Sequence, residues 1–281
     1  MVYQGSKAQL MKYIYPYIEN ELNSIDQNKN NILLYIEPFV GGANSIVYVK
    51  EKYQNQHPDV RFYGCDINPY LIDLLNYGKK YLIPNYGFTF EDKQNLQLHK
   101  EYLRKIVRKE LPNHLNLPKW YIGAINLLFT YRGLWDSGLS IDKNPKKSRI
   151  NQQIKNFNDM NLTNISFINL DYLDSLESLL AVTNYENNKY KAVVYLDPPY
   201  PGSDQKVYTR SKLFKEFSYC DKFINLIKSC DLNNVTFILS GLTPPQKLNF
   251  KLVWSKEIFN NASHSTKKHT RLENLYILKK E

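Results

Sequence analysis

The sequence predicts an α/β protein with a Rossmann-like, mostly parallel sheet and an inserted, mainly helical domain. Short runs of β-branched, aromatic and other apolar residues recur along the chain, and their near-continuous hydrophobicity is typical of strands buried on both faces. Helix-like segments separate several of these runs, and this alternation favours parallel strands joined by helices. Between residues 76 and 163 the alternation stops, and this segment is far too long for an ordinary connection.

The apolar runs are the candidate strands. They occupy residues 31–39, 60–66, 164–171, 191–200, 234–241, 251–259 and 273–278. Helical patterns cover residues 7–22, 69–82 and 217–230. We therefore assign residues 1–75 and 164–281 to one sheet-containing domain, and residues 76–163 to a domain inserted between its second and third strands.

Composition narrows the class of protein. The 281 residues are 43% hydrophobic, enough for a full core, and no apolar run reaches the roughly 18 residues that a membrane span needs. The 3 cysteines have no CxxC spacing and the 5 histidines are scattered, which indicates neither a disulfide framework nor a zinc site. We expect a cytoplasmic protein without a bound metal, and the formal charge of +10 suggests an anionic partner.

Most of the excess positive charge lies in the proposed insertion. Residues 76–163 contain 15 Lys and Arg against 7 Asp and Glu, while the rest of the chain has 22 and 20. In the helical pattern over residues 98–111, Lys100, Arg104 and Arg108 recur every four residues, a row that suits contact with phosphates. An ordinary solvated helix face explains the same row.

A second basic cluster lies in residues 130–149, where Gly and Pro alternate with basic and aromatic residues in a turn-forming pattern. We expect Arg132 and Trp135 to reach base edges in a groove of a nucleic acid, with Lys146 and Lys147 as further contacts to it. The alternative is structural, with Arg132 in a fold-stabilising network and Trp135 in the core. Together the two clusters favour a nucleic acid as the anionic partner.

Ligands of open α/β sheets bind at the carboxyl ends of the strands, so the residues there are candidate ligand contacts. Gly41 and Gly42 follow the first strand and allow a tight turn that brings the backbone close to a ligand. Asp66 ends the second strand, where an acid can accept hydrogen bonds from ribose hydroxyls or simply cap a helix. The third strand ends at Asp171 and Tyr172, which suit hydrogen bonding to and stacking on an adenine ring.

The fourth strand ends in Asp-Pro-Pro-Tyr, the candidate catalytic element. Pro198 and Pro199 fix the backbone and lack N–H groups, so hydrogen-bond acceptors predominate there. Asp197 and the Pro198 carbonyl are expected to accept both hydrogens of an exocyclic amino group while Tyr200 stacks on the base. Two such acceptors favour a pyramidal nitrogen whose lone pair attacks a methyl sulfonium, through positioning and electrostatics without a metal.

These motifs, in this order, resemble the Dam-like family of DNA adenine-N6 methyltransferases over nearly the whole chain. The resemblance implies a Rossmann-like methyltransferase sheet and a site-specific, adenine-specific DNA methyltransferase. Such an enzyme transfers a methyl group from S-adenosyl-L-methionine to N6 of an adenine flipped out of double-stranded DNA. Residues 76–163 would be its target-recognition domain. The resemblance implies a monomer and leaves open whether a cognate restriction endonuclease is a partner.

The resemblance also implies contacts to the cofactor, residue by residue. Tyr3 and Lys7 belong to the matching segment YQGSK, and Lys7 is expected to face the methionine carboxylate. Asp66 matches the ribose acid and Asp171 matches the acid that binds the cofactor adenine. The full set of expected cofactor contacts is Tyr3, Lys7, Pro38, Phe39, Val40, Gly41, Gly42, Asp66, Ile67, Asp171, Tyr172 and Asp197.

Two features of the pattern concern DNA directly. Family members that methylate GATC usually carry an Arg followed closely by Tyr-Asn-Gly, whereas here Arg132 is followed by Gly-Leu-Trp-Asp-Ser-Gly, so the target sequence is open. The segment 201–214, rich in turn formers, is expected to close over the flipped base with Arg210 at a phosphate. An ordinary exposed loop is the alternative.

Other functions fit parts of the pattern. An RNA or protein amino-methyltransferase uses a related tetrapeptide, and N4-cytosine methylation has the same geometry. A non-catalytic DNA-binding relative would keep the fold, but the presence of Asp197, Lys7 and Asp66 argues against it.

Overall fold

The structure is a computed structural model that describes residues 3, 5–25, 31–84, 93–130, 139, 149–184, 189–199, 219–241, 243–260 and 269–278. Its strands are β1 (Ile32–Glu37), β2 (Arg61–Asp66), β3 (Ile165–Asn169), β4 (Tyr190–Leu196), β5 (Val235–Gly241), β6 (Phe250–Asn260) and β7 (His269–Leu278). Its helices are α1 (Met11–Ile25), α2 (Asn44–Tyr53), α3 (Pro69–Gly78), α4 (Lys93–Val107), α5 (Lys119–Leu127), α6 (Arg149–Asn158), α7 (Tyr172–Asn184) and α9 (Asp221–Ser229).

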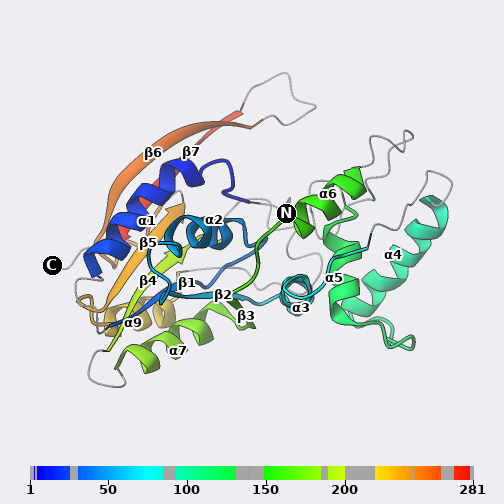
Figure 1. The fold of residues 1–281 in the computed structure, drawn as a ribbon, viewed down its shortest axis with the longest axis horizontal. Coiled ribbons are helices and arrows are strands. Elements are labelled where there is room, and N and C mark those ends of the chain that lie inside the picture. The colour runs from blue at the N-terminus through cyan, green and yellow to red at the C-terminus, as the bar shows by residue number, and fades with distance from the viewer. Residues whose placement is uncertain are drawn as a thin grey trace.

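The strands form one 7-stranded sheet in the order β3-β2-β1-β4-β5-β7-β6. The strands from β3 to β5 are parallel, and β7 pairs antiparallel with both β5 and β6. Helices α1 and α2 cover one face of the sheet, while α7 and α9 cover the other (Figure 1). Alternate side chains of β1 enter the two cores, Tyr35 on the first face and Leu34 on the second. The predicted fold class is therefore confirmed.

Strand ends differ from the predicted ones for reasons that matter to the site. The run 191–200 was predicted as strand throughout, but β4 ends at Leu196. Pro198 and Pro199 cannot donate to a sheet ladder, so they terminate the strand and leave Asp197 at its exit. In contrast, β7 begins before the predicted run, at His269, because its ladder with β6 continues beyond the end of β5.

Helices α4, α5 and α6 lie together beside the β3 edge of the sheet (Figure 1). Helix α3 packs closely against α5, since a Cβ atom added at Gly123 would lie 2.3 Å from the carbonyl oxygen of Tyr70. The predicted boundary after residue 75 falls inside α3, and one apolar cluster runs from the sheet into α4–α6. The division into two domains stays a prediction.

One prediction about α4 is wrong. The row of Lys100, Arg104 and Arg108 was expected on an outer face, but the Lys100 side chain is fully buried. The buried positions include Leu96, Lys100, Leu103 and Val107, the spacing of one helix face, while Leu98 is 65% exposed. Lys100 therefore lies on the buried face of the helix and not on an outer one.

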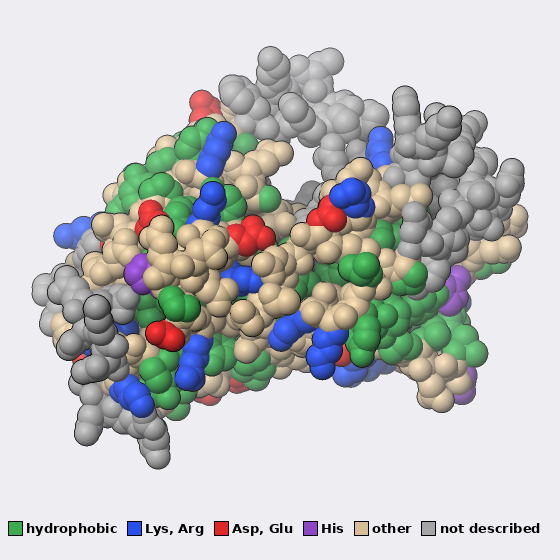
Figure 2. All heavy atoms as spheres, in the orientation of Figure 1, with side chains coloured by type: hydrophobic (Ala, Val, Ile, Leu, Met, Phe, Trp, Pro, Cys, Tyr) green, Lys and Arg blue, Asp and Glu red, His purple; other side chains and the backbone are tan. Residues whose placement is uncertain are grey.

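Figure 2 shows the surface hollowed between the part of the molecule that carries the sheet and the part that carries α4–α6. Basic side chains lie on both sides of this hollow in that view. Within the described ranges, no helix is long and apolar enough to cross a membrane, and no group of three or more His, Cys, Asp or Glu is placed to hold a metal ion. Cys65 and Cys230 are free thiols, and burial raises the pKa of each to about 11.

Candidate active site

The turn after β1 is shaped by close contact with Tyr3. Gly41 has a φ of +48°, and a Cβ atom added there would lie 2.9 Å from the Tyr3 ring. At Gly42 an added Cβ would lie 2.6 Å from Cβ of Tyr3, so the backbone here is as close as glycine allows. The sequence motifs around residues 3 and 41 are thereby brought together, as their shared assignment to the cofactor requires.

Asp66, at the end of β2, closes this turn from the other side. Its Oδ2 accepts a hydrogen bond from the Gly41 N–H at 3.2 Å, and its Oδ1 accepts from Asn68 N–H at 2.9 Å. Burial raises the pKa of the carboxyl to about 6, against the opposing effect of these two donors. The helix-cap alternative is not favoured, since Asn68 caps α3 by accepting from the N–H groups of Tyr70 and Leu71.

The remaining residues of the turn hold its shape. Pro38 is buried, and Val40, also buried, donates its N–H to the Cys65 carbonyl at 2.8 Å. Ile67 follows Asp66 and is partly exposed. These residues lie at the predicted place, and their contact with a cofactor stays a prediction.

Asp171 and Tyr172 lie at the start of α7, after β3. Asp171 Oδ1 accepts a hydrogen bond from Leu173 N–H at 2.9 Å, as a residue before a helix often does. The Tyr172 ring stacks on Phe39, with 5.2 Å between centroids, so the turns after β1 and β3 meet across the end of β2. Burial raises the pKa of the Tyr172 hydroxyl, with Cys220 adding to the shift.

Asp197, at the exit of β4, forms an ion pair with Lys7. The distance from Lys7 Nζ to Asp197 Oδ1 is 2.6 Å, and the side chains are 3% and 19% exposed. Lys7 Nζ also lies 3.4 Å from Glu273 Oε1 and 3.4 Å from the Gly5 carbonyl. These three acceptors match the three N–H donors of an ammonium group. The predicted contact of Lys7 with a methionine carboxylate stays a prediction.

Glu273, which the sequence reasoning missed, completes this centre from β7. Its side chain is fully buried, and its Oε1 also accepts a hydrogen bond from Ser240 Oγ at 3.0 Å. A buried carboxylate needs such partners to offset the loss of hydration. The only sequence signal was an acid at the first position of the apolar run 273–278. Nothing in that signal indicates a partner near the other end of the chain.

Glu37, the last residue of β1, is a second acid that the sequence reasoning left out. It is 1% exposed, and it accepts hydrogen bonds from Tyr35 Oη at 2.9 Å and Ser45 Oγ at 2.7 Å. Burial raises the pKa of this carboxyl to about 8, and the charge of Asp197 acts in the same direction. Glu37 is therefore mostly protonated at neutral pH, which limits the negative charge around Asp197.

The predicted DNA contacts are only partly within the described residues. Arg104 lies on α4 with 16% of its side chain exposed and an ion pair to Glu101 at 3.2 Å, while Arg108 is partly exposed beyond the end of the helix. The following predicted site residues lie outside the described residues: Arg132, Trp135, Lys146, Lys147, Tyr200 and Arg210.

The sheet, with its antiparallel last strands and its acids at the strand ends, defines a Rossmann-like protein of the methyltransferase class. Residues 3–273 match the family model of the D12 class N6 adenine-specific DNA methyltransferase. The chain therefore belongs to that family, as the motifs indicated.

No curated protein matches the chain. Among solved structures, the rRNA methyltransferase aviRa from Streptomyces viridochromogenes is similar at 12% identity, with a TM-score of 0.38, over 99% of this chain and 86% of that one.

Proposed function

We propose that this protein is a site-specific DNA methyltransferase that uses S-adenosyl-L-methionine to methylate N6 of an adenine flipped out of double-stranded DNA. The observation that carries the proposal is Asp197, a carboxylate held by Lys7 at a strand exit that two prolines make rigid. Membership of the adenine-specific family supports the choice of base.

The residues at the ends of β1 and β2 fit the cofactor. Gly41 and Gly42 leave room for backbone N–H groups to approach a ligand, and Asp66 keeps lone pairs for ribose hydroxyls beyond its two bonds to backbone N–H groups. Aromatic side chains for the adenine ring come from Phe39 and Tyr172. When bound, the cofactor supplies an electrophilic methyl group on a sulfonium.

The residues after β4 act on the target base. Asp197 and the Pro198 carbonyl accept hydrogen bonds from the amino group, which turns the nitrogen lone pair toward the methyl group. The Lys7 ammonium holds the Asp197 carboxylate through a charge-assisted hydrogen bond, so its oxygens are oriented before the base arrives. Tyr200 is proposed to stack on the flipped base.

DNA is proposed to lie across the hollow between the sheet and the helices of the insertion (Figure 2). Recognition of the sequence is assigned to residues 130–149 through Arg132, Trp135, Lys146 and Lys147, and contact with phosphates to Arg104, Arg108 and Arg210.

The direct test is the identity of the methylated nucleoside. Purified protein is incubated with labelled S-adenosyl-L-methionine and mixed-sequence duplex DNA, single-stranded DNA or RNA, and the products are digested and separated by mass spectrometry. We expect label only in N6-methyladenine, and chiefly from the duplex. Label in N4-methylcytosine or in RNA would support the corresponding alternative, and cofactor binding without transfer would support a non-catalytic relative.

A further inference from the structure

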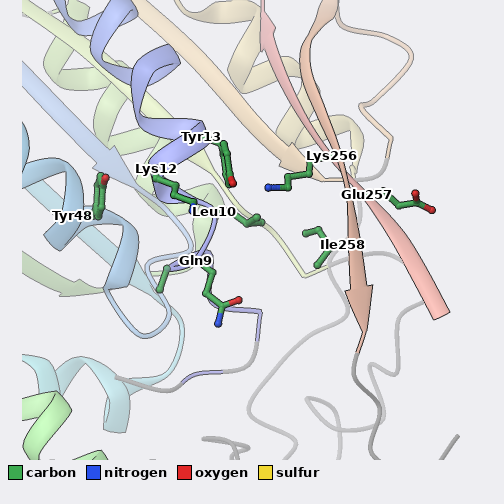
Figure 3. A pocket seen from close by; sticks show the side chains of 9 residues that line it. Gln9, Leu10, Lys12, Tyr13, Tyr48, Lys256, Glu257 and Ile258 are labelled. Carbon is green, nitrogen blue, oxygen red and sulfur yellow. The ribbon is translucent and has the colours of Figure 1, made fainter. Parts of the chain in front are cut away.

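We propose that the groove between α1, α2 and β6 binds a backbone phosphate of the DNA strand that carries the target base, an inference that rests on the function proposed above. The groove has a volume of about 650 Å³. Its walls are residues 8–10, Lys12, Tyr13, Tyr48 and residues 256–258 (Figure 3). None of these residues belongs to the cofactor set, the catalytic tetrapeptide or the insertion.

The groove adjoins the catalytic centre on two sides. Residues 8–10 directly follow Lys7, which contacts Asp197. Lys256 is the register partner of Glu273 in the ladder between β6 and β7, and directly paired residues of antiparallel strands point to the same face. Residue 8 of the groove thus directly follows Lys7, and Lys256 of its wall is paired across the ladder with Glu273, which also contacts Lys7.

Two lysines converge on one tyrosine in the groove. Lys256 Nζ lies 3.5 Å from the centroid of the Tyr13 ring, and Lys12 Nζ lies 4.9 Å from the same centroid. Tyr13 in turn stacks on Trp254, with 6.1 Å between centroids and 19° between planes. Two lysine ammonium groups therefore lie against the same aromatic ring.

The electrostatics of the groove favour an anion. Lys256 and Lys12 lie against the Tyr13 ring, and hydrogen bonding to them lowers the pKa of the Tyr13 hydroxyl, in keeping with a positive potential here. The one acid among the lining residues is Glu257, whose carboxylate points away from Tyr13 (Figure 3). This follows from strand alternation, because Lys256 and Glu257 project to opposite faces of β6.

A DNA phosphate fits this position better than a free anion. A flipped base stays covalently joined to its strand, so the phosphates next to it must cross the surface beside Asp197. Lysines commonly bind such phosphates without regard to sequence. In addition, β6 forms the edge of the sheet opposite to β3, whereas the insertion is attached between β2 and β3. The groove would hold the DNA backbone at the sheet edge opposite to the one where the insertion is attached.

The test compares lysine variants of the full chain by fluorescence anisotropy with a labelled duplex over a range of salt concentrations. The variants are Lys12→Gln, Lys256→Gln and their combination, with Lys256→Arg to restore the charge. Lys251→Gln is the matched control, since Lys251 is exposed on the same strand, at its other end. Melting temperatures and binding of S-adenosyl-L-methionine are measured on each protein.

We expect each groove variant to weaken DNA binding about 5-fold near 0.1 M salt and to lower the salt slope by about 0.9, with twice that change in slope for the combination. Cofactor binding should not change, and Lys256→Arg should bind like the unmodified protein. Affinities and slopes equal to those of Lys251→Gln would overturn the proposal. If Lys256→Gln no longer melts cooperatively, the DNA binding of Lys12→Gln alone tests the proposal, because the Lys12 side chain is exposed and its replacement should not disturb the fold.

One further assay distinguishes failure of the phosphate-site proposal from failure of the proposed function. Unmodified protein is assayed for N6-methyladenine in the same preparations. If the unmodified protein methylates DNA and the lysine variants bind DNA as it does, only the proposed phosphate site is ruled out. If the unmodified protein does not methylate DNA, the proposed function itself is ruled out.

Discussion

Lys7 and Asp197 form an ion pair of 2.6 Å that joins the segment before α1 to the exit of β4. The pair is largely removed from water, so each charge depends on the other for compensation. It also fixes one oxygen of the carboxylate that is proposed to receive the target amine. The catalytic arrangement therefore exists only when the two ends of this long-range contact have come together.

Replacement of Asp197 by Ala is expected to abolish methyl transfer and leave DNA binding within a small factor. The variant keeps the groove and the insertion but has no carboxylate to orient the amine. Tyr200→Ala should be only partly impaired, since stacking on a base contributes roughly 1–3 kcal/mol. Single-turnover rates and anisotropy on the same duplex provide the measurement, and substantial turnover by the Asp197 variant would contradict the mechanism.

Replacement of Glu273 by Gln should lower kcat about tenfold, with little change in the KM for DNA. Gln keeps an oxygen acceptor for Lys7 and Ser240 but removes the negative charge, so Lys7 is drawn toward Asp197 and its position changes. A hydrogen bond to a charged group contributes about 1.5–3 kcal/mol, so stability should fall as well.

A double-mutant cycle with Lys7→Met separates this coupling from general loss of stability. Each single substitution leaves a buried charge with fewer partners, and the double substitution removes the buried lysine charge together with one carboxylate. We expect the loss in unfolding free energy for the double variant to be smaller than the sum of the single losses. Additive losses would show that Glu273 and Lys7 act independently.

The sequence places acids at strand ends where the signal is local, and their roles in the site stay predictions. Asp66 ends the apolar run 60–66, and Asp197 stands directly before the two prolines of the run 191–200. The parallel sheet places both acids at the carboxyl ends of its strands. Glu273 could not be predicted, because its partner lies near the other end of the chain and depends on how β7 inserts beside β5. Lys100 was misplaced because helical spacing shows that one face is apolar, while tertiary packing decides which residues at its border become buried.

The buried acid Glu37 predicts a dependence of stability on pH. Its carboxyl has a pKa of about 8 in the folded protein against an ordinary value of 4.5, so the folded state holds the proton more tightly. Stability is therefore expected to fall as pH rises through this window, by up to about 1.4 kcal/mol per pH unit.

Chemical unfolding of the unmodified protein and of Glu37→Gln, between about pH 5 and pH 8, isolates this effect. The Gln variant keeps the shape of the side chain but has no titrating carboxyl. The unfolding free energy of the unmodified protein should therefore fall relative to that of the variant as pH rises. Asp66, with a pKa raised to about 6, contributes in the same direction to both proteins and cancels in the comparison. If the unfolding free energies of the two proteins changed with pH in parallel, Glu37 would not be the group responsible.

Substitution of Gly42 by Ala should impair cofactor binding through Tyr3. The added Cβ would lie 2.6 Å from Cβ of Tyr3, which cannot move without its backbone. Overpacking of this kind costs about 1–3 kcal/mol. In a Tyr3→Gly background the clashing Cβ is absent, so the further loss caused by Gly42→Ala should be smaller when measured by calorimetry with S-adenosyl-L-methionine. An equal loss in both backgrounds would assign the effect to the glycine backbone itself.

The last prediction separates contact with phosphates from recognition of bases in the insertion. Arg104 is largely buried and paired with Glu101, so Arg104→Ala should lower the melting temperature and weaken binding equally on all duplexes. Arg132→Ala should cost about 1–3 kcal/mol on the recognised sequence alone, because base-edge contacts discriminate and phosphate contacts do not. The two variants are compared on cognate and scrambled duplexes once sequencing of methylated DNA has identified the target. Equal losses on both duplexes for Arg132→Ala, with an unchanged melting temperature, would show that residues 130–149 do not recognise sequence through this arginine.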